Sequence, residues 1–559
     1  MKKKAVSRMM AVALACALVL AGCGGKSDEP AQKEQGTADA ANQESESETS
    51  GGDGETGAQA SSNGELRTIS IFNSHGTVSD FTDPVAEAIK ERTGFTVEYI
   101  DGAGAVEEKL NLMLSGQTYP DIVYLDSASA VRKAYEEAGA LVDMKDLIEQ
   151  HGPDIKKMYG DLLVRFESAD GGIYGLGDWY DLDPDPNVMV MIKYDLLVDV
   201  AGKERADDHE TPFSQEEFIQ LLKDYQAKYP DGTPISVQGK EWDVTMFNGM
   251  FGVVEYYTAN SRIEHKVKDP QFKEMIRFIN QIYREGLLDK DWVTLGWDQL
   301  EEKITQGNTF CTVDSNWIAS RPNQALRISD GEDADFRSYK VVGEGVTAEQ
   351  TTYNSRNTLG WGDWCITTNC EDPVAAMEFC NFMASEEGQY LTLWGVEGEH
   401  WEYVDGKHKP IQEFLDAYRA DTAATGRATG VRKYRMFVKN GFGEDGTPYD
   451  MDAKYEPSID WQWAYMASAD TDLYDNSYYA GLEPAGSTPE GLIAQKVKDI
   501  YSEYVPKMVN AATEEESMSQ YDAMISDMEG AGLEKLEDVM TETYLEKMER
   551  WGVEPYSHR

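Results

Sequence analysis

The chain has 559 residues, and its 101 Asp and Glu side chains outnumber 51 Lys and Arg, for a formal net charge of −50. This length allows two or three domain cores, and an aromatic content of 11% is too high for a disordered chain. Nucleic acid and anionic membrane surfaces are poor partners for such a chain, because binding phosphate requires Lys and Arg.

The first 22 residues have the pattern of a signal peptide. Lys2 to Lys4 and Arg8 precede an apolar run over residues 9–20, and small residues then lead to Cys23. The sequence LAGC at 20–23 resembles a bacterial lipobox, which implies cleavage before Cys23 and lipidation of its thiol, including palmitate. An ordinary signal peptide with a stray cysteine is the alternative. Losing the four cationic residues leaves a net charge of about −54.

Residues 23–64 are predicted to be a lipidated cysteine followed by a disordered tether. The stretch contains almost no apolar side chains, so it cannot bury enough surface to offset chain entropy. No further apolar run of 18 or more residues follows it. We therefore expect a chain anchored by lipid to the extracellular face of the cell membrane, with no spanning segment.

The first folded segment predicts a parallel sheet. Asp83 and Pro84 provide a helix start and Gly94 a stop, between two strands with alternating or continuous apolar residues. Strands and helices alternate with short loops over residues 66–72, 83–94, 95–100, 106–115, 122–125 and 128–138. Ligands bind at the carboxyl ends of such strands, which here are 73–75, 101–104 and 126–127.

Helices and strands continue to alternate in the rest of the chain, and there is no internal repeat. Ser214 and Glu217 form a capping box at the start of one helix. Periodicity predicts helices over 214–229, 271–285, 300–306, 372–384, 488–509 and 520–551, and strands over 309–313 and 362–367.

Four cysteines remain after loss of Cys16 and lipidation of Cys23. Their spacing does not match a metal site, which would require tighter clustering with histidine. We expect buried free thiols, with a disulfide between Cys370 and Cys380 as the alternative. No resident cofactor or metal is predicted.

All twelve tryptophans follow residue 178, and many stand beside Asp or Asn in loop-like contexts. Examples are Trp179 with Tyr180 and Asp181, Trp242 with its flanking acids, and the GWGDW motif at 360–364. Aromatic rings stack on the C–H faces of sugars, and carboxylates accept bonds from their hydroxyls. The clusters therefore favour a carbohydrate site over simple core packing.

Two longer segments resemble the extracellular solute-binding protein family 1 of ABC importers, in its large Gram-positive lipoprotein branch. They are YPDIV at 119–123 and the stretch 360–407, which contains GWGDWCITTN, SEEGQ and GVEGEHW. The resemblance covers residues 66 to 555. It implies an α/β, two-lobed periplasmic-binding-protein-like fold of type II. Each lobe would be a mostly parallel sheet flanked by helices, with a hinge between the lobes.

The resemblance also implies domain limits, partners and site residues. The N-terminal lobe would comprise 65–182 plus about 364–430, and the C-terminal lobe 183–363 plus about 431–559. The partners would be a small carbohydrate ligand and the ABC permease subunits, with the chain a monomer and no catalysis. The family's cleft-lining positions carry over to Asp126, Trp242, Asp314, Trp317, Trp361, Asp363 and Trp461, and the aromatic clusters add Trp179, Tyr180 and Asp181. His400 is expected to pack inside a lobe.

Three functions remain open from the residues. The first is a receptor that captures an oligosaccharide for import. The second is a receptor for another solute, such as a peptide or polyamine, because Trp–Asp pairs also suit cations. The third is an extracellular glycoside hydrolase, which would use two carboxylates. No GxSxG, HExxH or P-loop motif supports another enzyme class.

Calcium is not predicted. Some members of the family carry a calcium loop after a helix like 214–229, but residues 229–234 here read as a plain turn. Asp181, Asp183 and Asp185 alternate, but Pro184 and Pro186 interrupt them.

Overall fold

The computed structural model describes residues 66–73, 80–102, 105–127, 129–259 and 261–555. The predicted signal peptide, the lipidation site Cys23 and the tether lie outside these residues. Within the described part of the chain, no helix is both long and apolar enough to cross a bilayer.

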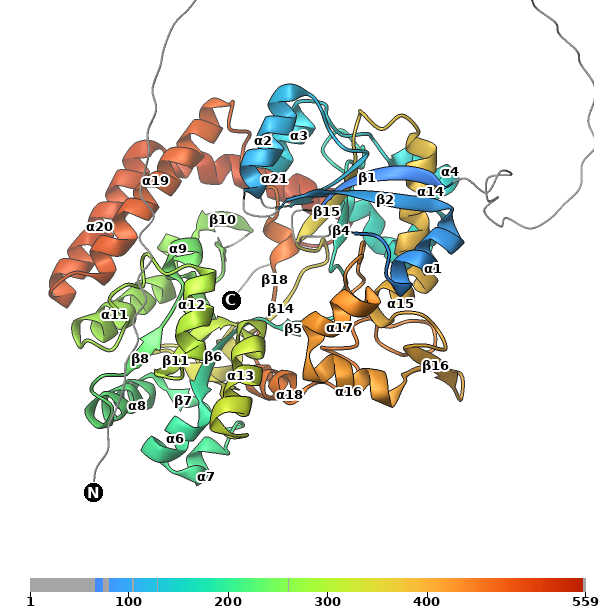
Figure 1. The fold of residues 1–559 in the computed structure, drawn as a ribbon. Helices are drawn as coiled ribbons and strands as arrows, with labels where there is room; N and C mark the ends of the chain where they lie inside the picture. The colour runs from blue at the N-terminus through green and yellow to red at the C-terminus, as the bar shows by residue number, and fades with distance from the viewer. Residues whose placement is uncertain (1–65, 74–79, 103–104, 128, 260, 556–559) are drawn as a thin grey trace, which may run out of the picture. The chain divides into compact units, whose positions relative to one another are not determined.

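The first lobe is built on a five-stranded sheet in the order β2-β1-β3-β15-β4 (Figure 1). β1 pairs in parallel with both β2 and β3, which confirms the predicted β-α-β-α-β unit. β15 pairs antiparallel with β3 and with β4. The elements up to the first crossing are β1 (Arg67–Asn73), α1 (Pro84–Thr93), β2 (Phe95–Asp101), α2 (Val106–Gly116), β3 (Ile122–Asp126), α3 (Ala130–Glu137), α4 (Lys145–His151), α5 (Pro153–Tyr159), η1 (Gly160–Phe166) and β4 (Leu176–Asp178).

Alternation along the strands of this sheet fills a core on each face. Ile71 packs in a large cluster on one face, and its neighbour Phe72 packs in a smaller cluster on the other. Tyr124 and Val123 divide in the same way. The continuous apolar strands of the sequence therefore reflect burial on both faces.

The chain returns to this lobe from residue 358. His400 is buried and accepts a hydrogen bond from the Val396 N–H at 2.9 Å, which confirms its predicted packing role. Cys365 and Cys380 are buried free thiols, as is Cys311 in the other lobe, and Cys370 is free and half-buried. The elements are β15 (Gly362–Ile366), α14 (Pro373–Ala384), α15 (Glu386–Trp394), β16 (Trp401–Val404), β17 (Lys407–Pro410), α16 (Gln412–Ala420) and α17 (Thr422–Thr429).

The second lobe is built on a four-stranded sheet in the order β12-β6-β11-β8. The predicted helix at 214–229 is confirmed, and the Ser214 side chain accepts from the Glu217 N–H at 3.2 Å. The elements are β6 (Val188–Lys193), α6 (Tyr194–Ala201), α7 (Lys203–Ala206), β7 (Phe213–Ser214), α8 (Gln215–Lys228), β8 (Thr233–Ser236), α9 (Gly239–Trp242), η2 (Thr245–Phe247), α10 (Asn248–Phe251), β9 (Tyr256–Ala259), β10 (Arg262–His265), η3 (Lys266–Lys268), α11 (Pro270–Arg284), α12 (Trp297–Thr305), β11 (Thr309–Ser315), η4 (Asn316–Ala319), α13 (Ser320–Asp330), β12 (Phe336–Tyr339), β13 (Val341–Val342) and η5 (Ala348–Gln350).

The C-terminal region adds further helices and corrects one prediction. The helix predicted over 520–551 is wrong as a single element, because Gly532 adopts a left-handed φ of 108° and divides it. The elements here are α18 (Ile459–Ser468), η6 (Asn476–Tyr479), α19 (Pro489–Val509), α20 (Glu514–Ala531) and α21 (Leu533–Trp551).

Each large sheet contains one strand that opposes the others, so both sheets are mixed, although most of their strands share one direction as predicted. Among the described strands, β15 and β6 are the ones that run against their neighbours in the two lobes. Both enter their lobes directly from short crossover strands, at the edge where the neighbouring strands end. Their direction is therefore opposite to that of strands made by β-α-β turns.

The crossover strands form a small sheet of their own, here called the hinge sheet, in the order β18-β14-β5. It consists of β5 (Asp185–Pro186), β14 (Asn354–Arg356) and β18 (Leu473–Asp475). Arg356 Nε donates to Asp475 Oδ2 at 2.8 Å, and the Asp475 side chain is only 2% exposed. The Arg165 guanidinium extends the network by donating to Thr358 Oγ1 at 2.7 Å.

Core packing suggests different limits for the lobes. Val438 and Met451 pack in the same cluster as Ile71 of the first lobe, whereas Ala464 packs with the second. We therefore propose that the first lobe extends to about residue 455, beyond the predicted limit near 430.

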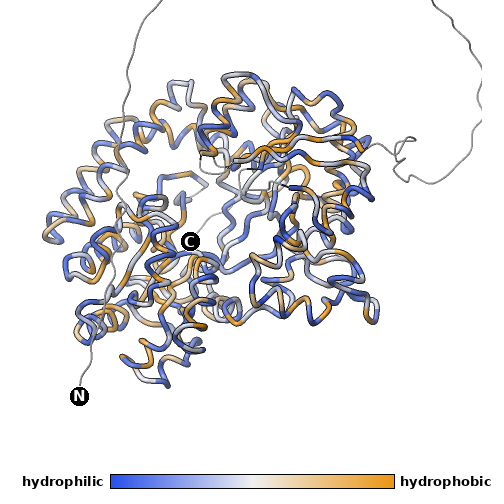
Figure 2. Tube along the Cα trace, viewed as in Figure 1, coloured by the Kyte–Doolittle hydropathy of each residue, from blue (hydrophilic) through white to orange (hydrophobic). Residues whose placement is uncertain are grey.

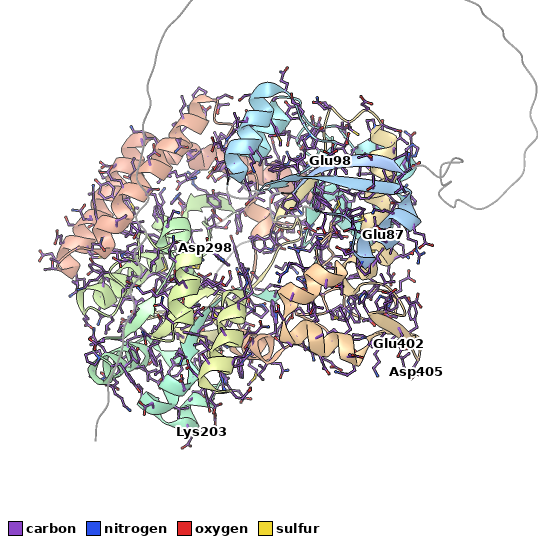
Figure 3. All side chains as sticks on the ribbon, viewed as in Figure 1. Glu87, Glu98, Lys203, Asp298, Glu402 and Asp405 are labelled. Atoms are coloured by element: carbon purple, nitrogen blue, oxygen red, sulfur yellow. The ribbon has the colours of Figure 1, made fainter. Side chains whose placement is uncertain are left out.

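Polar and apolar residues alternate along the outer helices (Figure 2). Charged side chains such as Glu87, Glu98 and Lys203 are exposed on the outside of their elements (Figure 3). The strong negative charge is therefore carried by a solvated surface, where it affects solubility more than the fold.

We expect Arg356→Met to lower the free energy of unfolding by about 3 kcal/mol, because it leaves the buried Asp475 carboxylate without its charge partner. Urea unfolding followed by tryptophan fluorescence measures the loss. Arg92→Met is the matched control, since its partner Glu387 is 60% exposed, and it should cost less than about 1 kcal/mol. Equal losses for the two variants would contradict a special role of the hinge pair.

Candidate ligand-binding site

Trp361 stands at the end of the first sheet where β3 and β4 terminate, next to the hinge sheet. This line of strand ends is here called the edge of the sheet. β3 ends at Asp126 and β4 ends at Asp178, and both residues pair with Gly362 at the start of β15. The Trp361 N–H donates to the Asp178 carbonyl at 3.0 Å, and its side chain is 50% exposed. Strand register therefore gathers Asp126 and Trp361 at one edge.

The glycines on either side of Trp361 allow this position. A Cβ on Gly360, whose φ is 80°, would overlap the Asp178 carbonyl oxygen. A Cβ on Gly362 would overlap the hydroxyl of Tyr124. The GWG motif thus lets the backbone approach both neighbouring strands while the indole remains outside.

Trp179 extends the same edge from the end of β4. It has a left-handed φ of 64°, and its N–H donates to the Val438 carbonyl at 2.8 Å. The guanidinium groups of Arg432 and Arg435 lie 5.3 and 5.9 Å from its ring centroid. These contacts hold a half-buried indole beside two cations.

Two predicted site residues have structural roles instead. Tyr180 is completely buried and stacks on Tyr159 at 3.8 Å in the core of the first lobe, so the prediction that it contacts ligand is corrected. The Asp363 carboxylate is bound by Arg132 Nε at 2.8 Å, and burial raises the pKa of Asp363 despite this cation. We therefore assign Asp363 to holding α3 against β15.

Asp181 and the acidic residues after it face the first lobe's own loops. Asp181 lies 4.0 Å from Lys439 Nζ, and Lys454 Nζ lies 3.4 Å from Asp183 and 3.6 Å from Asp185. Burial raises the pKa of both Asp181 and Asp185. Across the described residues, no group of three or more His, Cys, Asp or Glu side chains is arranged to hold a metal ion.

Asp314 and Trp317 mark the equivalent edge of the second sheet. β11 ends at Ser315, which pairs with Val188 at the start of β6, two residues after the hinge strand β5. Asp314 is fully buried and accepts from Gln238 Nε2 at 2.6 Å. Trp317 is 51% exposed in η4 and lies against Trp297, with ring centroids 4.3 Å apart.

Helix α18 brings a further tryptophan to this edge. α18 packs against η4 and β5. Trp461 is half-buried and contacts the ring of Tyr465, whereas Trp463 is buried, with the Arg337 guanidinium 4.4 Å from its centroid. Trp242 is the last residue of α9, which follows Gln238, and its side chain lies outside the described residues.

Three residues of these edges were missed by sequence reasoning. Gln238 is separated from the end of strand β8 by Val237 alone, so the rule that ligands bind at strand ends could have found it. Trp297 stands beside Asp298 at a helix start and fits the aromatic–acid pattern. Arg435 carries no local signal, because only tertiary packing places it beside Trp179.

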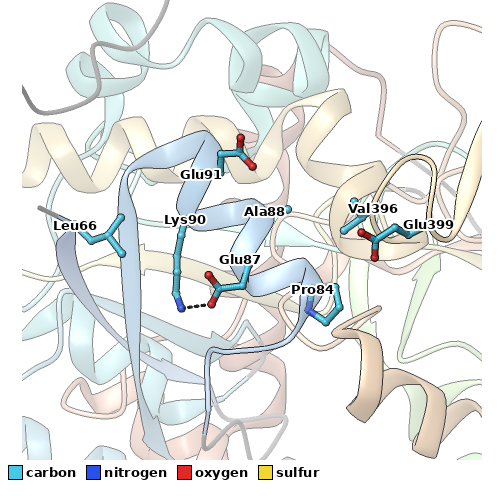
Figure 4. A pocket seen from close by; sticks show the side chains of 8 residues that line it. All are labelled: Leu66, Pro84, Glu87, Ala88, Lys90, Glu91, Val396 and Glu399. Carbon is cyan, nitrogen blue, oxygen red and sulfur yellow. Dashed lines mark hydrogen bonds and ion pairs between the residues drawn. The ribbon is translucent and has the colours of Figure 1, made fainter. Parts of the chain in front are cut away.

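Two surface pockets lie away from these edges. One, of about 630 Å³, is formed by α1 and the segment near Glu399, and Lys90 Nζ pairs with Glu87 there at 2.7 Å (Figure 4). The other, of about 470 Å³, is lined by residues of α2 and of the loop before β3, including Leu112 and Tyr119. Neither pocket contains a tryptophan, so the sheet edges remain the better candidates for sugar stacking.

We expect Asp178→Asn to remove a loss in the free energy of unfolding that the parent protein shows as the pH rises. Burial raises the pKa of Asp178 from 3.8 to about 6. The fold favours the protonated carboxyl, so the contribution of Asp178 to the free energy of unfolding is largest below about pH 4. This contribution is lost as the pH rises through about 6. The asparagine variant, which can still accept from the Val438 N–H, should be more stable at pH 7 by up to about 3 kcal/mol and equal to the parent near pH 4. Unfolding curves of both proteins from pH 4 to 8 test this, and a difference independent of pH would refute it.

Residues 85–396 match the model of a family described as bacterial extracellular solute-binding protein. A protein of Streptococcus pneumoniae serotype 4, named carbohydrate ABC transporter substrate-binding protein, is 22% identical over 388 residues, which are 66% of this chain and 73% of that protein. Lipoprotein LipO of Bacillus subtilis strain 168 is 23% identical over 354 residues, 59% of this chain and 66% of LipO.

Solved structures share the fold. The alginate-binding protein AlgQ2, in a crystal structure without calcium ion, superposes with a TM-score of 0.65 and 18% identity over 88% of this chain and 100% of that chain. The S. pneumoniae substrate-binding protein FusA in complex with kestose gives 0.61 and 15% identity over 86% of this chain and 99% of that chain. With the family match covering more than half of its length, this two-lobed type II chain belongs to the bacterial extracellular solute-binding protein family.

Proposed function

We propose that the chain is the substrate-binding lipoprotein of an ABC importer, and that it captures an oligosaccharide between the two tryptophan-bearing sheet edges. The observation that carries the proposal is the exposure of Trp317 and Trp361, at 51% and 50%. They are the exposed ones among the tryptophans whose side chains the structure describes. Trp361 follows the hinge strand β14 in the chain, and Trp317 follows Ser315, which pairs with Val188 just after the hinge strand β5.

The chemistry of these edges suits a sugar. An exposed indole offers a flat apolar face to the C–H groups of a pyranose or furanose ring, and carboxylates and amides accept and donate bonds to hydroxyls. Stacking releases water from apolar surface that the unliganded protein leaves exposed. The residues proposed for the site are Asp126, Trp179, Asp181, Trp242, Asp314, Trp317, Trp361 and Trp461, with Trp297 and Gln238 as supports.

The relatives support carbohydrate as the ligand class. The S. pneumoniae protein is named a carbohydrate transporter component, and FusA is named for fructooligosaccharide. Their names describe those proteins, and the tryptophan-bearing edges are what link this chain to the same class.

Ligand capture would work by a shift between open and closed lobes. An oligosaccharide that contacts both edges binds the closed state better than the open one, so it favours closure. The hinge sheet is the element that would bend, since its strands connect the lobes through two or three residues each. The permease would then recognise the closed form.

The remaining parts of the proposal concern the anchor and the partners. A lipid on Cys23 would hold a monomeric chain at the extracellular face of the cell membrane, beside the permease. The chain would release its ligand chemically unchanged, without catalysis or a cofactor.

We expect Trp361→Ala and Trp317→Ala each to weaken oligosaccharide binding about 10- to 100-fold, because each removes one stacking face. A thermal-shift screen of mono- and oligosaccharides, with peptides and polyamines as controls, identifies the ligand, and calorimetry measures the affinities. Tyr403→Ala is the matched control, since Tyr403 is a 54% exposed aromatic residue on the β16–β17 hairpin. Stabilisation by peptides or polyamines alone would overturn the carbohydrate assignment.

We expect Cys23→Ser to release the protein from the membrane, because a serine cannot accept the thioether-linked lipid. Fractionation of cells that express the parent and the variant measures the fraction in the medium. Retention of the variant in the membrane fraction would show that another segment anchors the chain.

A further inference from the structure

Arg435 is a cation at the edge of the first sheet that forms no ion pair with a carboxylate of the described residues. Among the described residues it makes one hydrogen bond, from Nη1 to the Arg432 carbonyl at 2.7 Å, and it forms no ion pair. Neighbouring arginines differ in this respect. Arg432 is bound to Asp450 at 2.7 Å, and Arg132 to Asp363 at 2.8 Å. Four of the five N–H donors of Arg435 are thus left for another partner.

Arg435 shares this lack of an ion pair with other described arginines of this chain, such as Arg165 and Arg419, but of these three it is the one that lies against Trp179. Acidic side chains outnumber basic ones by 101 to 51, so a carboxylate is available to most cations on its surface. The Asp178 carboxylate interacts electrostatically with Arg435, but among the described residues no hydrogen bond or ion pair joins the two side chains, and Asp178 Oδ1 accepts from the Val438 N–H at 2.5 Å. The folded chain therefore keeps Arg435 half-buried without a directly bonded carboxylate, at a cost in solvation.

The surroundings of Arg435 place it in the proposed ligand site. Its guanidinium lies 5.9 Å from the ring centroid of Trp179, which directly follows the strand-end residue Asp178. The hydroxyl of Tyr124 lies beside Gly362, and Arg435 interacts electrostatically with Tyr124. Trp361 is bound to Asp178 through its own backbone N–H. Arg435 thus lies at the same sheet edge as the exposed indole of Trp361 and the half-buried indole of Trp179.

The local electrostatics favour an anion at this place. Burial lowers the pKa of Arg435, and the positive charge of Arg432 lowers it further. An incoming anionic group would offset both effects, because it would supply a directly bonded counter-charge. The planar guanidinium can also bind both oxygens of a carboxylate at once, whereas a single hydroxyl of a neutral sugar offers it only one oxygen.

We infer that the carbohydrate taken up by this site carries an anionic group, and that Arg435 recognises that group while the tryptophans stack on the sugar rings. The inference rests on the function proposed above and narrows it to acidic glycans. The chemistry required is an anionic substituent on a sugar ring, as the carboxylate of a uronic or sialic acid or as a sulfate ester.

The test compares matched pairs of neutral and acidic glycans. The purified full-length chain in detergent is applied to an array in which each uronate-bearing, sialylated or sulfated glycan has its uncharged counterpart, and the affinities of hits are measured by calorimetry. We expect acidic members to bind about 10- to 100-fold more tightly than their neutral counterparts, with the preference decreasing as salt is added. The arms show which anionic group is recognised.

Three variants assign the preference to Arg435. Arg435→Met keeps a long side chain against Trp179 but removes the charge, so it should bind acidic glycans about 10- to 100-fold more weakly and neutral ones as before. Arg435→Lys keeps the charge without the planar fork and should retain part of the preference. Arg92→Met removes one positive charge from an exposed pair of the same lobe and should bind like the parent.

The outcomes separate this inference from the proposed function. Binding of neutral and acidic glycans with equal affinity would leave the carbohydrate function standing and overturn the inference. A preference that survives in Arg435→Met would also overturn it, provided that circular dichroism shows the variant folded. If no glycan binds at all, both fail together.

Discussion

The structure depends on three short strands that connect its two lobes. β14 pairs with both β5 and β18 at the junction, and Arg356 neutralises the nearly buried carboxylate of Asp475 in this sheet. Because the crossover strands run directly into β6 and toward β15, both large sheets present one edge next to the hinge sheet. This arrangement explains the mixed strand directions. It also explains why the tryptophans and the strand-end carboxylates lie beside the hinge sheet.

Charged side chains near these edges have two different roles. Asp363 and Asp450 are each bound by an arginine, so their charges hold neighbouring segments together. A buried pair of this kind contributes little net stability, but losing one partner leaves an uncompensated charge. Arg435 lies among such pairs but forms no ion pair within the described part of the chain, which is why we propose that it recognises a ligand.

The aromatic residues divide in a similar way. Tyr180, Trp364 and Trp463 are buried and fill the cores, although their sequence contexts resemble those of the exposed tryptophans. Trp361 and Trp317 remain exposed because tight backbone contacts or a partner ring hold them at a strand end. Burying them against a ligand would remove a large apolar surface from water, which is the main source of affinity in such a site.

The sequence by itself determined the local elements and the class of the fold. Asp83 caps α1 and Gly94 ends it as predicted, and the alternating strands gave the parallel β1–β2–β3 unit, because capping and periodicity act over a few residues. The motif at 360–369 led to the correct family. Trp317 and Trp361, which the structure leaves exposed, were among the predicted site residues, because tryptophan beside glycine, aspartate or asparagine is a local signal.

Tertiary structure alone decided which of these side chains remain accessible and which directions the strands take. Gly532 was read as part of a helix, because a glycine within a periodic segment shows no sign of its left-handed conformation. Tyr180 was placed in the site although Tyr159 covers its ring, and Arg435 was overlooked although it flanks Trp179. Burial and pairing of these groups depend on segments tens to hundreds of residues away, and a pattern along the chain carries no information about such contacts.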